Sequence, residues 1–392
     1  MNIQTKAVHA GDRKKPGPQT PSTTPIHLAS TYFYDTTEHL DKVFGQEIEG
    51  ESYSRYSNPT NTALEELVAS LENAPGALAC SSGMMALQVA LMAALLDRRK
   101  SVLAANALYG ASIKLLTQVF GAFGVEVRFV DICDLNAVRS AAEEEKPGCI
   151  FMETISNPLL RVGNIEEVAK IARAHGAALV VDNTFATPLM VHPIALGAHI
   201  SVHSLTKYLA GHGDVLGGAV ICDEEHLPVV RQLCKTLGPN LGPVEAYLAM
   251  RGIKTFPMRM ERQCRNASRL ASWLVTHPKV DRVYFPGDPA HPDSATVSRM
   301  FPKDLFGAIV SFELKGLTEQ QQVFEFMDRL KLIVRGTSLG DVHSLLLYPA
   351  MASHRDLGFK QRLRLGIKEN LVRVSVGIEA VEDIIADLEQ AL

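Results

Sequence analysis

Short apolar runs alternate with amphipathic helical segments between residues 61 and 255, and this alternation constrains the fold more than any other feature. Strands that alternate with helices favour a mainly parallel sheet with helices on both faces. The segment NIEEVAKIARAHG, residues 164–176, has the spacing of one such helix. We expect strands at SVLAAN (101–106), VEVRFVD (125–131), GCIFMET (148–154), AALVVDNT (177–184), HISVHS (199–204) and GGAVIC (217–222).

The pattern changes after Pro257, where a long helical segment, MRMERQCRNASRLASWLVTHP, precedes separate strands near 307–314 and 371–376. This change predicts a second, smaller α+β unit. A chain of 392 residues also exceeds the size at which a single core stops growing, about 250–300 residues. We therefore expect an α/β protein with an N-terminal arm at 1–60, a parallel-sheet domain at 61–255 and a C-terminal domain at 256–392.

The arm is rich in Pro, Gly, Ser and Thr between residues 11 and 60 and has no clear period, which is typical of an extended segment. Such a segment buries little apolar surface by itself. Its aromatic side chains are therefore expected to pack on another surface, namely that of a neighbouring subunit. These side chains are Tyr32, Phe33, Tyr34, Tyr53 and Tyr56.

Charge and cysteine usage argue against several classes of protein. The 39 Lys and Arg residues against 43 Asp and Glu give a formal charge of -4, and no dense basic run suits a nucleic acid. The six cysteines include no C-x-x-C pair, which predicts a cytoplasmic protein with reduced thiols and no zinc site. The N-terminal residues lack an apolar signal segment, and MMALQVALMAALL, residues 84–96, is too short to cross a bilayer. We expect neither secretion nor membrane insertion.

Ligands of open α/β sheets bind outside the carboxyl ends of the strands, so polar residues at these ends are candidate site residues. Asp182 ends the run AALVV, and Lys207 lies in SVHSLTKYLAGHGD, just after the expected strand at 199–204. Taken singly, Asp182 is equally a turn or N-cap residue, and Lys207 is equally a surface lysine. Together they meet the demands of pyridoxal phosphate (PLP). A desolvated lysine forms a Schiff base with its aldehyde, and an aspartate keeps its pyridine nitrogen protonated.

The phosphate of this cofactor needs a site of its own. The sequence ACSSGMMALQVALMAALL places Ser81, Ser82 and Gly83 directly before a strong helix, where free N–H groups and the helix dipole attract an anion. An ordinary serine N-cap explains the same residues equally well. Further candidate donors are Ser204 and Thr206 beside Lys207, and Tyr53 and Arg55 in YSRYSNPT.

Two other residues are candidates for contacts with the ring and the substrate. Tyr109, in NALYGAS, follows the expected strand at 101–106, and its ring can stack on a pyridine; a plain exposed aromatic is the alternative. Arg373, in ENLVRVSVG, suits a substrate carboxylate because its guanidinium donates two parallel hydrogen bonds. Alternation along its strand directs Arg373 either to solvent or into a site, and the period does not distinguish the two.

Together these motifs resemble the Cys/Met-metabolism PLP enzymes, which comprise cystathionine γ-synthase, cystathionine γ-lyase, methionine γ-lyase and the homoserine-ester sulfhydrylases. The resemblance runs from VHAG at 8–11 to VRVSVGIE at 372–379, and the blocks DNTFATP (182–188) and SLTKYLAGHGDVLGG (204–218) are highly specific. It implies the fold type I, aspartate aminotransferase-like architecture, with a mainly parallel sheet domain and a smaller C-terminal domain. It also implies a homotetramer of two active dimers.

The resemblance implies a role for each matching residue. Lys207 is similar to the Schiff-base lysine that also carries protons, Asp182 to the partner of the pyridine nitrogen, and Tyr109 to the stacking tyrosine. The residues that match the phosphate site are Ser82, Gly83, Met84, Ser204 and Thr206, with Tyr53 and Arg55 reaching the phosphate of an adjacent subunit. The residues that match the binders of the substrate carboxylate are Asn157, Ser338 and Arg373.

The reaction follows less directly from the sequence. Ala111 stands where methionine γ-lyases commonly carry Cys, and LYGAS departs from the YGGT or YGGS of the cystathionine enzymes. His343 stands where those enzymes usually have Glu, whereas Asp341 in SLGD resembles methionine γ-lyase and sulfhydrylase loops. We expect a lyase that eliminates a thiol from Cγ of methionine, homocysteine or cystathionine. The alternative is γ-replacement, in which an O-acyl-homoserine accepts cysteine or sulfide.

Other classes of function have weaker signals. His203, His212 and Asp214 are metal-ligand types, but no H-x-x-x-H helix pattern accompanies them, and we expect no metal. The sequence GAFG at 121–124 falls short of the G-x-G-x-x-G that a dinucleotide requires. A non-catalytic binding module is expected to have lost Lys207 or Asp182, and this chain keeps both.

Overall fold

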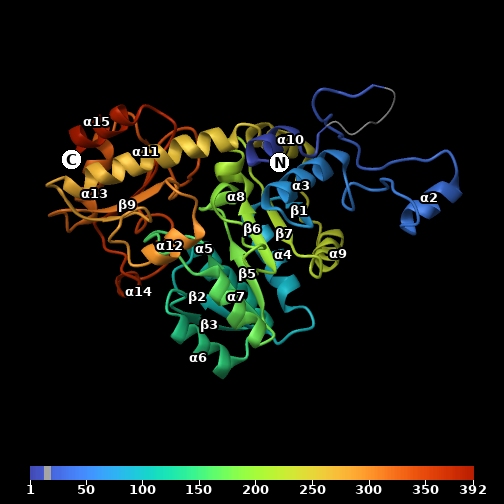
Figure 1. Cartoon of the computed structure of the whole chain (residues 1–392), viewed down its shortest axis with the longest axis horizontal. Helices are drawn as coiled ribbons and strands as arrows, with labels where there is room; N and C mark the ends of the chain where they lie inside the picture. The colour runs from blue at the N-terminus through green and yellow to red at the C-terminus, as the bar shows by residue number, and fades with distance from the viewer. Residues whose placement is uncertain (13–18) are drawn as a thin grey trace.

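The computed structural model describes residues 1–12 and 19–392, and its larger sheet has seven strands in the order β1-β7-β6-β5-β4-β2-β3 (Figure 1). Strand β7 is antiparallel to both of its neighbours, whereas β6, β5, β4, β2 and β3 are parallel to one another. The prediction of a mainly parallel sheet is confirmed. The strands are β1 (Gly76–Cys80), β2 (Ser101–Ala105), β3 (Glu126–Val130), β4 (Cys149–Glu153), β5 (Ala178–Asp182), β6 (Ile200–Ser204) and β7 (Gly218–Cys222).

Six of these strands lie within the ranges expected from the sequence, and β1 was not expected. Its run, GALAC, consists mostly of residues with low strand propensity, so the local signal is weak. All five residues of β2, β4 and β7 are buried. Burial on both faces explains why these strands are continuous apolar runs rather than alternating ones.

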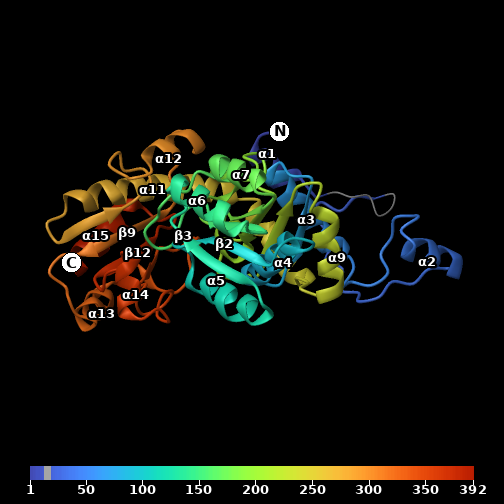
Figure 2. The same cartoon turned by 90° about the horizontal axis from the view of Figure 1, so that it is seen from below.

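Helices cover both faces of this sheet. Figure 2 shows α6 (Leu135–Glu145) and α7 (Ile165–Ala174) on one side and α4 (Gly83–Leu95) and α5 (Gly110–Lys114) on the other. Helix α4 is apolar on all sides because it packs against β5, β6 and β7 in the centre of the fold. In the described part of the chain, no helix is long and apolar enough to cross a membrane. The remaining helices of this unit include α3 (Pro59–Glu72), α8 (Thr187–Met190), α9 (Leu227–Leu237) and α10 (Pro243–Ile253).

The smaller unit has a five-stranded sheet in the order β10-β11-β12-β9-β8, with its own buried core. Helix α11 (Phe256–Thr276) runs along both units, as Figure 1 shows, so one long helix connects them. The predicted C-terminal α+β unit is confirmed, while its exact boundaries stay a prediction. Its strands are β8 (Val280–Tyr284), β9 (Ile309–Leu314), β10 (Val334–Arg335), β11 (Leu345–Leu347) and β12 (Leu371–Ser375). Its further helices are α12 (Ser294–Met300), α13 (Gln320–Arg329), α14 (Phe359–Arg364) and α15 (Val381–Ala391).

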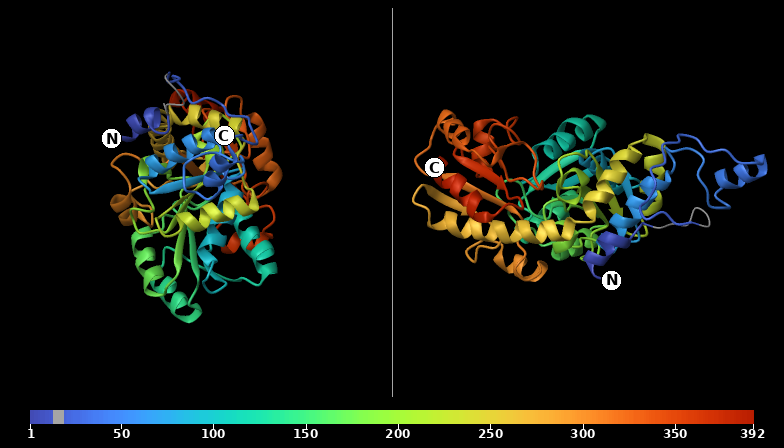
Figure 3. Two further views of the ribbon diagram at one scale, coloured as in Figure 1. Left: turned by 90° about the vertical axis from the view of Figure 1, so that its right-hand side faces the viewer. Right: turned by 90° about the horizontal axis from the view of Figure 1, so that it is seen from above.

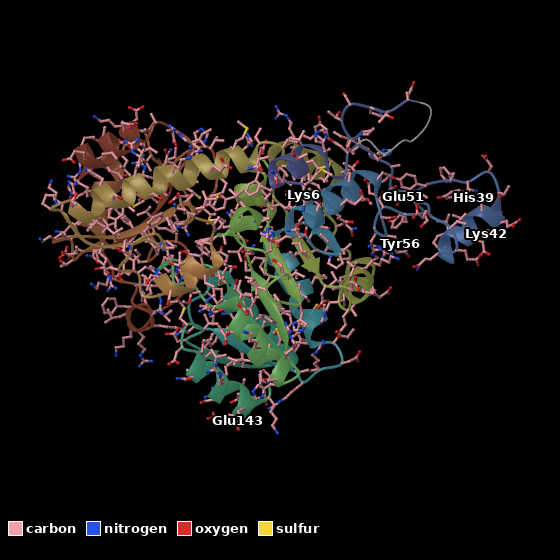
Figure 4. The ribbon with its side chains drawn as sticks, viewed as in Figure 1. Lys6, His39, Lys42, Glu51, Tyr56 and Glu143 are labelled. Atoms are coloured by element: carbon pink, nitrogen blue, oxygen red, sulfur yellow. The ribbon has the colours of Figure 1, made fainter. Side chains whose placement is uncertain are left out.

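The N-terminal segment is less uniformly extended than expected. Helix α1 (Ile3–His9) packs against α3 and α11, and α2 (Thr37–Phe44) is a separate helix whose N-cap Thr36 accepts a hydrogen bond from the backbone of His39. Residues 13–18 of the predicted arm lie outside the described residues. The part that carries α2 extends away from the body (Figure 3), and Figure 4 shows His39 and Lys42 at its far end.

Candidate active site

A cavity of about 220 Å³ lies at the carboxyl ends of β4, β5 and β6 and at the start of α4. Residues of the smaller unit, from the segment 337–373, complete its wall. The position agrees with the rule that ligands of open α/β sheets bind at strand ends. Ten predicted site residues line it: Ser82, Gly83, Met84, Tyr109, Asn157, Asp182, Ser204, Thr206, Lys207 and Arg373.

Lys207 reaches this cavity because the chain leaves β6 in an irregular turn. Its backbone angles, φ −89° and ψ −135°, interrupt the helical segment Leu205–Leu209. Its Nζ donates a hydrogen bond to Ser338 Oγ at 2.8 Å, which brings together residues 131 positions apart. Burial, with a smaller contribution from the positive charge of Arg373, lowers the pKa of Lys207 to about 8. About a tenth of this amine is therefore neutral and nucleophilic at pH 7, far more than for an ordinary lysine.

Asp182 occupies the last position of β5, at the cavity wall. Its Oδ1 accepts a hydrogen bond from the backbone N–H of Thr184 at 2.9 Å. Burial raises the pKa of the Asp182 carboxyl above its ordinary value, while hydrogen bonds from Thr184 and the charge of His203 oppose this rise. The carboxylate is thus suited to a cationic hydrogen-bond donor inside the cavity.

The start of α4 forms one end of the cavity. Ser82 is an N-cap, as the alternative interpretation held, and its Oγ accepts from the N–H of Met85 at 3.1 Å. The N–H groups of Gly83 and Met84 have no acceptor within the helix, because the first turn of a helix leaves its donors unpaired. A Cβ at Gly83 would lie 2.9 Å from Cβ of Ser204, so only glycine keeps this corner open. The capping and anion-binding interpretations are therefore compatible.

The hydroxyl of Thr206 is bonded to the protein backbone rather than free in the cavity. Its Oγ1 donates to the carbonyl of Gly217 at 3.2 Å and accepts from the N–H of the same residue at 3.0 Å. Ser204 donates its backbone N–H to Thr184 Oγ1 at 2.9 Å. Of the two hydroxyls expected at a phosphate, that of Thr206 is already engaged by Gly217.

Arg373 points into the cavity from β12. Its Nη1 donates to Asn157 Oδ1 at 2.8 Å and its Nη2 to the carbonyl of Ser338 at 3.3 Å. Among the described residues its buried Nε has no hydrogen-bond partner, and burial lowers the pKa of Arg373 to about 10. A buried guanidinium with an unpaired donor is costly unless an anion binds it. The chemistry of this buried guanidinium therefore suits a carboxylate ligand.

Sequence reasoning missed Glu153, a buried carboxylate at the last position of β4. It lies opposite Asp182 in the strand register, and its oxygens accept the backbone N–H of Tyr109 at 2.6 Å and of Asn157 at 3.2 Å. Burial and the neighbouring Asp182 charge raise the pKa of Glu153 well above its ordinary value. The strand-end rule that selected Asp182 would also have found Glu153, which holds two cavity loops in place.

Tyr109 lies at the mouth of the cavity, with 41% of its surface exposed. It precedes α5, and a Cβ on the following Gly110 would lie 2.1 Å from the carbonyl of Ser353. This close approach fixes the loop against the smaller unit. The ring of Tyr109 is therefore held at the entrance without closing it.

Several candidate residues do not line this cavity. Arg55 lines a wider hollow of about 970 Å³ between the arm and α9, where it donates to the carbonyl of Lys235 and lies over the ring of Tyr56 at 4.8 Å. Tyr53 lies in the same arm and is partly exposed. His343 has a largely exposed side chain whose Nδ1 lies 3.1 Å from Asp341 Oδ1. Among the residues that the structure describes, no group of three or more His, Cys, Asp or Glu side chains is arranged for a metal ion.

Comparison with known proteins identifies the family. A sequence profile described as "Cys/Met metabolism PLP-dependent enzyme" matches residues 4–392. The chain belongs to this family. It is 42% identical over 393 residues to the L-methionine gamma-lyase of Fusobacterium nucleatum subsp. polymorphum, covering 100% of this chain and 98% of that protein. It is 39% identical to the cystathionine beta-lyase of Lactococcus lactis subsp. cremoris, over 100% of this chain and 99% of that protein.

Other members with different names are also similar. The O-succinylhomoserine sulfhydrylase of Pseudomonas aeruginosa is 37% identical, over 100% of this chain and 95% of that protein. The crystal structure of cystathionine gamma-lyase from Lactobacillus plantarum, complexed with L-serine, superposes with a TM-score of 0.92 at 35% identity, covering 100% of this chain and 98% of that chain. The family and these structural neighbours confirm the predicted PLP-dependent fold type I architecture.

The residues of the cavity suit PLP. Lys207 offers a partly neutral amine for the aldehyde, and Asp182 offers a carboxylate for the pyridine nitrogen. The start of α4 offers unpaired N–H groups for the phosphate, so each of the three groups has a partner. When bound, PLP supplies an aldehyde that reacts with amines and a protonated ring that withdraws electrons from Cα of a substrate. No group of PLP is paired with Arg373, so its guanidinium remains available to a substrate.

Proposed function

We propose that this enzyme catalyses α,γ-elimination on L-methionine, L-homocysteine or L-cystathionine. The reaction consumes one water and yields 2-oxobutanoate, ammonia and a thiol. The observation that carries the proposal is the placement of Lys207 and Arg373 in one cavity, both in contact with Ser338. Because Lys207 and Arg373 both contact Ser338, the distance between the base and the binder of the substrate carboxylate is fixed. This arrangement holds Cα of a bound amino acid near the amine that removes its proton.

The proposed roles follow from these positions. Arg373, Asn157 and Ser338 bind the substrate carboxylate, and Lys207 removes the protons at Cα and Cβ. Tyr109, at the mouth, donates a proton to the departing sulfur. Asp182 keeps the pyridine nitrogen of PLP protonated. When PLP is bound, the start of α4 would hold its phosphate through Ser82, Gly83, Met84, Ser204 and Thr206, and Thr206 would exchange its bond to Gly217 for this contact.

The lining of the cavity favours elimination over replacement. Among the described residues that line it, Lys207 and Arg373 are the only basic side chains, and the rest of the wall includes Ile155, Leu339 and Leu347. L-methionine and L-homocysteine each carry one carboxylate and suit this lining, whereas L-cystathionine, a succinyl ester or a cysteine nucleophile brings a second carboxylate. The alternative, γ-replacement on an O-acyl-homoserine, is supported by the similarity to the Pseudomonas sulfhydrylase and to solved structures of cystathionine gamma synthase.

Product analysis tests this proposal directly. Purified PLP-loaded enzyme is given L-methionine, L-cystathionine, and O-acetyl- or O-succinylhomoserine with and without cysteine or sulfide. Formation of 2-oxobutanoate from methionine without a nucleophile is the expected result. Accumulation of cystathionine or homocysteine from the esters would establish replacement instead. Pyruvate with homocysteine from cystathionine would establish elimination at Cβ and contradict the proposal.

Arg373→Gln is expected to raise KM for L-methionine at least about 30-fold, with a smaller effect on kcat. Removing one partner of a buried charged contact costs about 2–5 kcal/mol. The variant keeps a donor for Asn157, so the fold of β12 is maintained. Steady-state kinetics measure the effect, and an unchanged KM would place the substrate carboxylate elsewhere. Arg335→Gln, an exposed arginine on β10 paired with Asp328, is the matched control.

The lowered pKa of Lys207 predicts how the apoenzyme captures PLP. Below pH 8 the protonated amine cannot attack an aldehyde, so the rate constant should fall about tenfold per pH unit. Above pH 8 the rate should level off. Stopped-flow absorbance between pH 6.5 and 9.5 measures this profile. A rate that still rises at pH 9.5 would mean that Lys207 keeps the ordinary pKa of 10.5 and that burial does not lower it.

We also propose a homotetramer of two active dimers, in which Tyr53 and Arg55 of one subunit contact the cofactor phosphate of its neighbour. The outward position of the arm and the exposure of Phe33, at 92%, support a partner there. All six cysteines are free thiols, which supports the proposal of a cytoplasmic enzyme.

Hybrid dimers test the shared site. Arg55→Ala and Lys207→Ala should each be impaired alone. A mixed dimer restores one complete site, because Lys207 comes from one subunit and Arg55 from the other. Random mixing should recover up to about a quarter of wild-type activity, since half of the dimers are hybrid and each has one site of two. Absence of recovery after verified subunit exchange would show that each site is built within one chain.

A further inference from the structure

The backbone turn that carries Lys207 is bound by a buried arginine, Arg259 on α11. Only 6% of the surface of Arg259 is exposed, and it is not among the described residues that line the cavity. Its Nη1 donates to the carbonyl of Tyr208 at 2.9 Å. Its Nη2 donates to the carbonyls of Leu209 at 3.0 Å and Ala210 at 3.4 Å. Three consecutive carbonyls directly after Lys207 therefore share one guanidinium.

These carbonyls need donors from elsewhere in the fold. The helical segment Leu205–Leu209 ends here, and the last carbonyls of a helix have no following N–H within it. Lys207 also departs from helical angles inside this segment, so its conformation depends on the surroundings. A guanidinium suits the task, because its five N–H donors lie in one rigid plane. A Cβ on Gly211 would collide with this guanidinium, so only glycine permits the close contact.

The other partners of Arg259 are neutral as well. Its Nη2 donates to the carbonyl of Gly252, on α10, at 2.9 Å, and its Nε donates to the hydroxyl of Thr255, the N-cap of α11, at 3.2 Å. Arg259 thus connects the junction of two helices to the turn of Lys207. Burying a charge costs free energy, and an apolar side chain would fill the same space without this cost. The donors of Arg259 therefore have a more specific use than packing.

The same turn also contacts the segment that carries Ser338. Gly340 has φ +75°, and a Cβ on it would lie 2.5 Å from the backbone nitrogen of Tyr208. Two residues earlier, Ser338 accepts the hydrogen bond from Lys207 Nζ. A shift of the turn away from Arg259 would therefore change how Lys207 lies relative to Ser338.

We propose that Arg259 is a positioning residue that fixes the turn after β6, so that Lys207 Nζ is directed at Ser338 and at the aldehyde of PLP. The inference rests on the proposed role of Lys207 as the amine that captures PLP. In that step Nζ bonds to the aldehyde carbon and one water is released. A purely structural role, in which Arg259 only joins α10 and α11 to the core, predicts lower stability with no selective effect on this step.

Pyridoxamine phosphate separates the two explanations, because it has the ring and phosphate of PLP but no aldehyde. Its affinity for the apoenzyme reports the noncovalent site, whereas the rate of PLP capture reports Lys207. In Arg259→Met, a side chain of similar length fills the core but donates no hydrogen bond. We expect capture to slow at least about tenfold, because small misplacements of a reacting group are costly. The affinity for pyridoxamine phosphate should stay within about twofold of the wild type.

Stopped-flow absorbance measures capture, and calorimetry measures the affinity for pyridoxamine phosphate. Borohydride reduction followed by peptide mass spectrometry checks that the captured PLP is on Lys207. Arg259→Lys keeps the charge, but an ammonium lacks the planar fork that binds several carbonyls at once. Its capture rate should lie between those of Arg259→Met and the wild type. If Arg259→Met does not fold, capture at the wild-type rate in Arg259→Lys would overturn the inference.

Asp387→Asn is the matched control. Asp387 on α15 is also a buried charge, 5% exposed, that binds three consecutive backbone groups. Its carboxylate accepts from the N–H groups of Lys331 at 2.8 Å, Leu332 at 2.9 Å and Ile333 at 2.8 Å. It is not among the described residues of the cavity wall. The variant should lower thermal stability without slowing capture.

Lys207→Ala separates failure of the inference from failure of the proposed function. If Lys207→Ala abolishes capture and Arg259→Met captures PLP at the wild-type rate, the inference is overturned and the role of Lys207 stands. If Lys207→Ala captures PLP at the wild-type rate, both are overturned. Equal losses of capture and of pyridoxamine phosphate affinity in Arg259→Met would also overturn the inference, since the whole site would then be disturbed. Equal slowing in Asp387→Asn would do the same.

Discussion

Replacing Lys207 with alanine is expected to lower kcat for thiol release from L-methionine at least about a thousandfold, equivalent to about 4 kcal/mol. The reason is that Lys207 Nζ is the one side-chain amine of the described cavity wall, and it lies within hydrogen-bond distance of Ser338. No other base there can take the protons at Cα and Cβ with the same geometry. Coupled detection of 2-oxobutanoate at saturating substrate measures the loss.

The variant should still fold and bind PLP weakly, because the start of α4 and Asp182 are unchanged. Removal of a buried, partly charged amine is also expected to leave thermal stability of the apoenzyme unchanged or higher. Lys170→Ala is the matched control, since Lys170 is an exposed lysine on α7 that pairs with Glu166 and Glu167. Turnover near the wild-type level in Lys207→Ala would remove this residue from the mechanism.

Asp182→Ala is expected to lower kcat/KM about 100-fold or more and to weaken PLP binding together with it. A hydrogen bond to a charged group contributes about 1.5–3 kcal/mol to binding, and loss of ring protonation acts on the rate in addition. Equilibrium dialysis gives the affinity for PLP, and kinetics at saturating PLP give the rate. The loss in kcat/KM should therefore persist when PLP is in excess, in addition to the weaker binding of PLP.

Asp134→Ala provides the comparison for this variant. Asp134 caps α6 by accepting from the backbone of Asn136 and Ala137, away from the cavity. Loss of this cap should cost about 1 kcal/mol of stability and leave kinetics unchanged. If Asp182→Ala behaves in the same way, with full activity at saturating PLP, the pyridine nitrogen is held by another group.

Glu153 and Asp182 illustrate how far the strand-end rule extends. Both residues end neighbouring strands, both lie in the cavity wall, and the register places them opposite each other. The sequence shows each as a carboxylate at the end of an apolar run, and the strand-end rule was applied to Asp182, together with Lys207, but not to Glu153. Burial and partners distinguish them, since Glu153 is engaged by two backbone N–H groups whereas Asp182 accepts from Thr184.

Arg373 illustrates what periodicity cannot decide. All five residues of β12 are buried, so alternation of polar and apolar residues does not mark the face that meets the cavity. Its partner Asn157 is 216 residues earlier in the chain. Arg55 shows the same limit, because its contact with the carbonyl of Lys235 joins residues 180 positions apart.

The sequence by itself determined six strands of the larger sheet, the residue types that PLP requires and the family to which the chain belongs. Periodicity and motifs depend on neighbours a few residues apart, and these are written directly in the chain. Only the tertiary structure decided that Lys207 contacts Ser338, that Arg373 turns inward and that His203 contacts Glu72. These arrangements depend on packing between distant segments, where burial and desolvation set the charge of each group, and no local pattern encodes them.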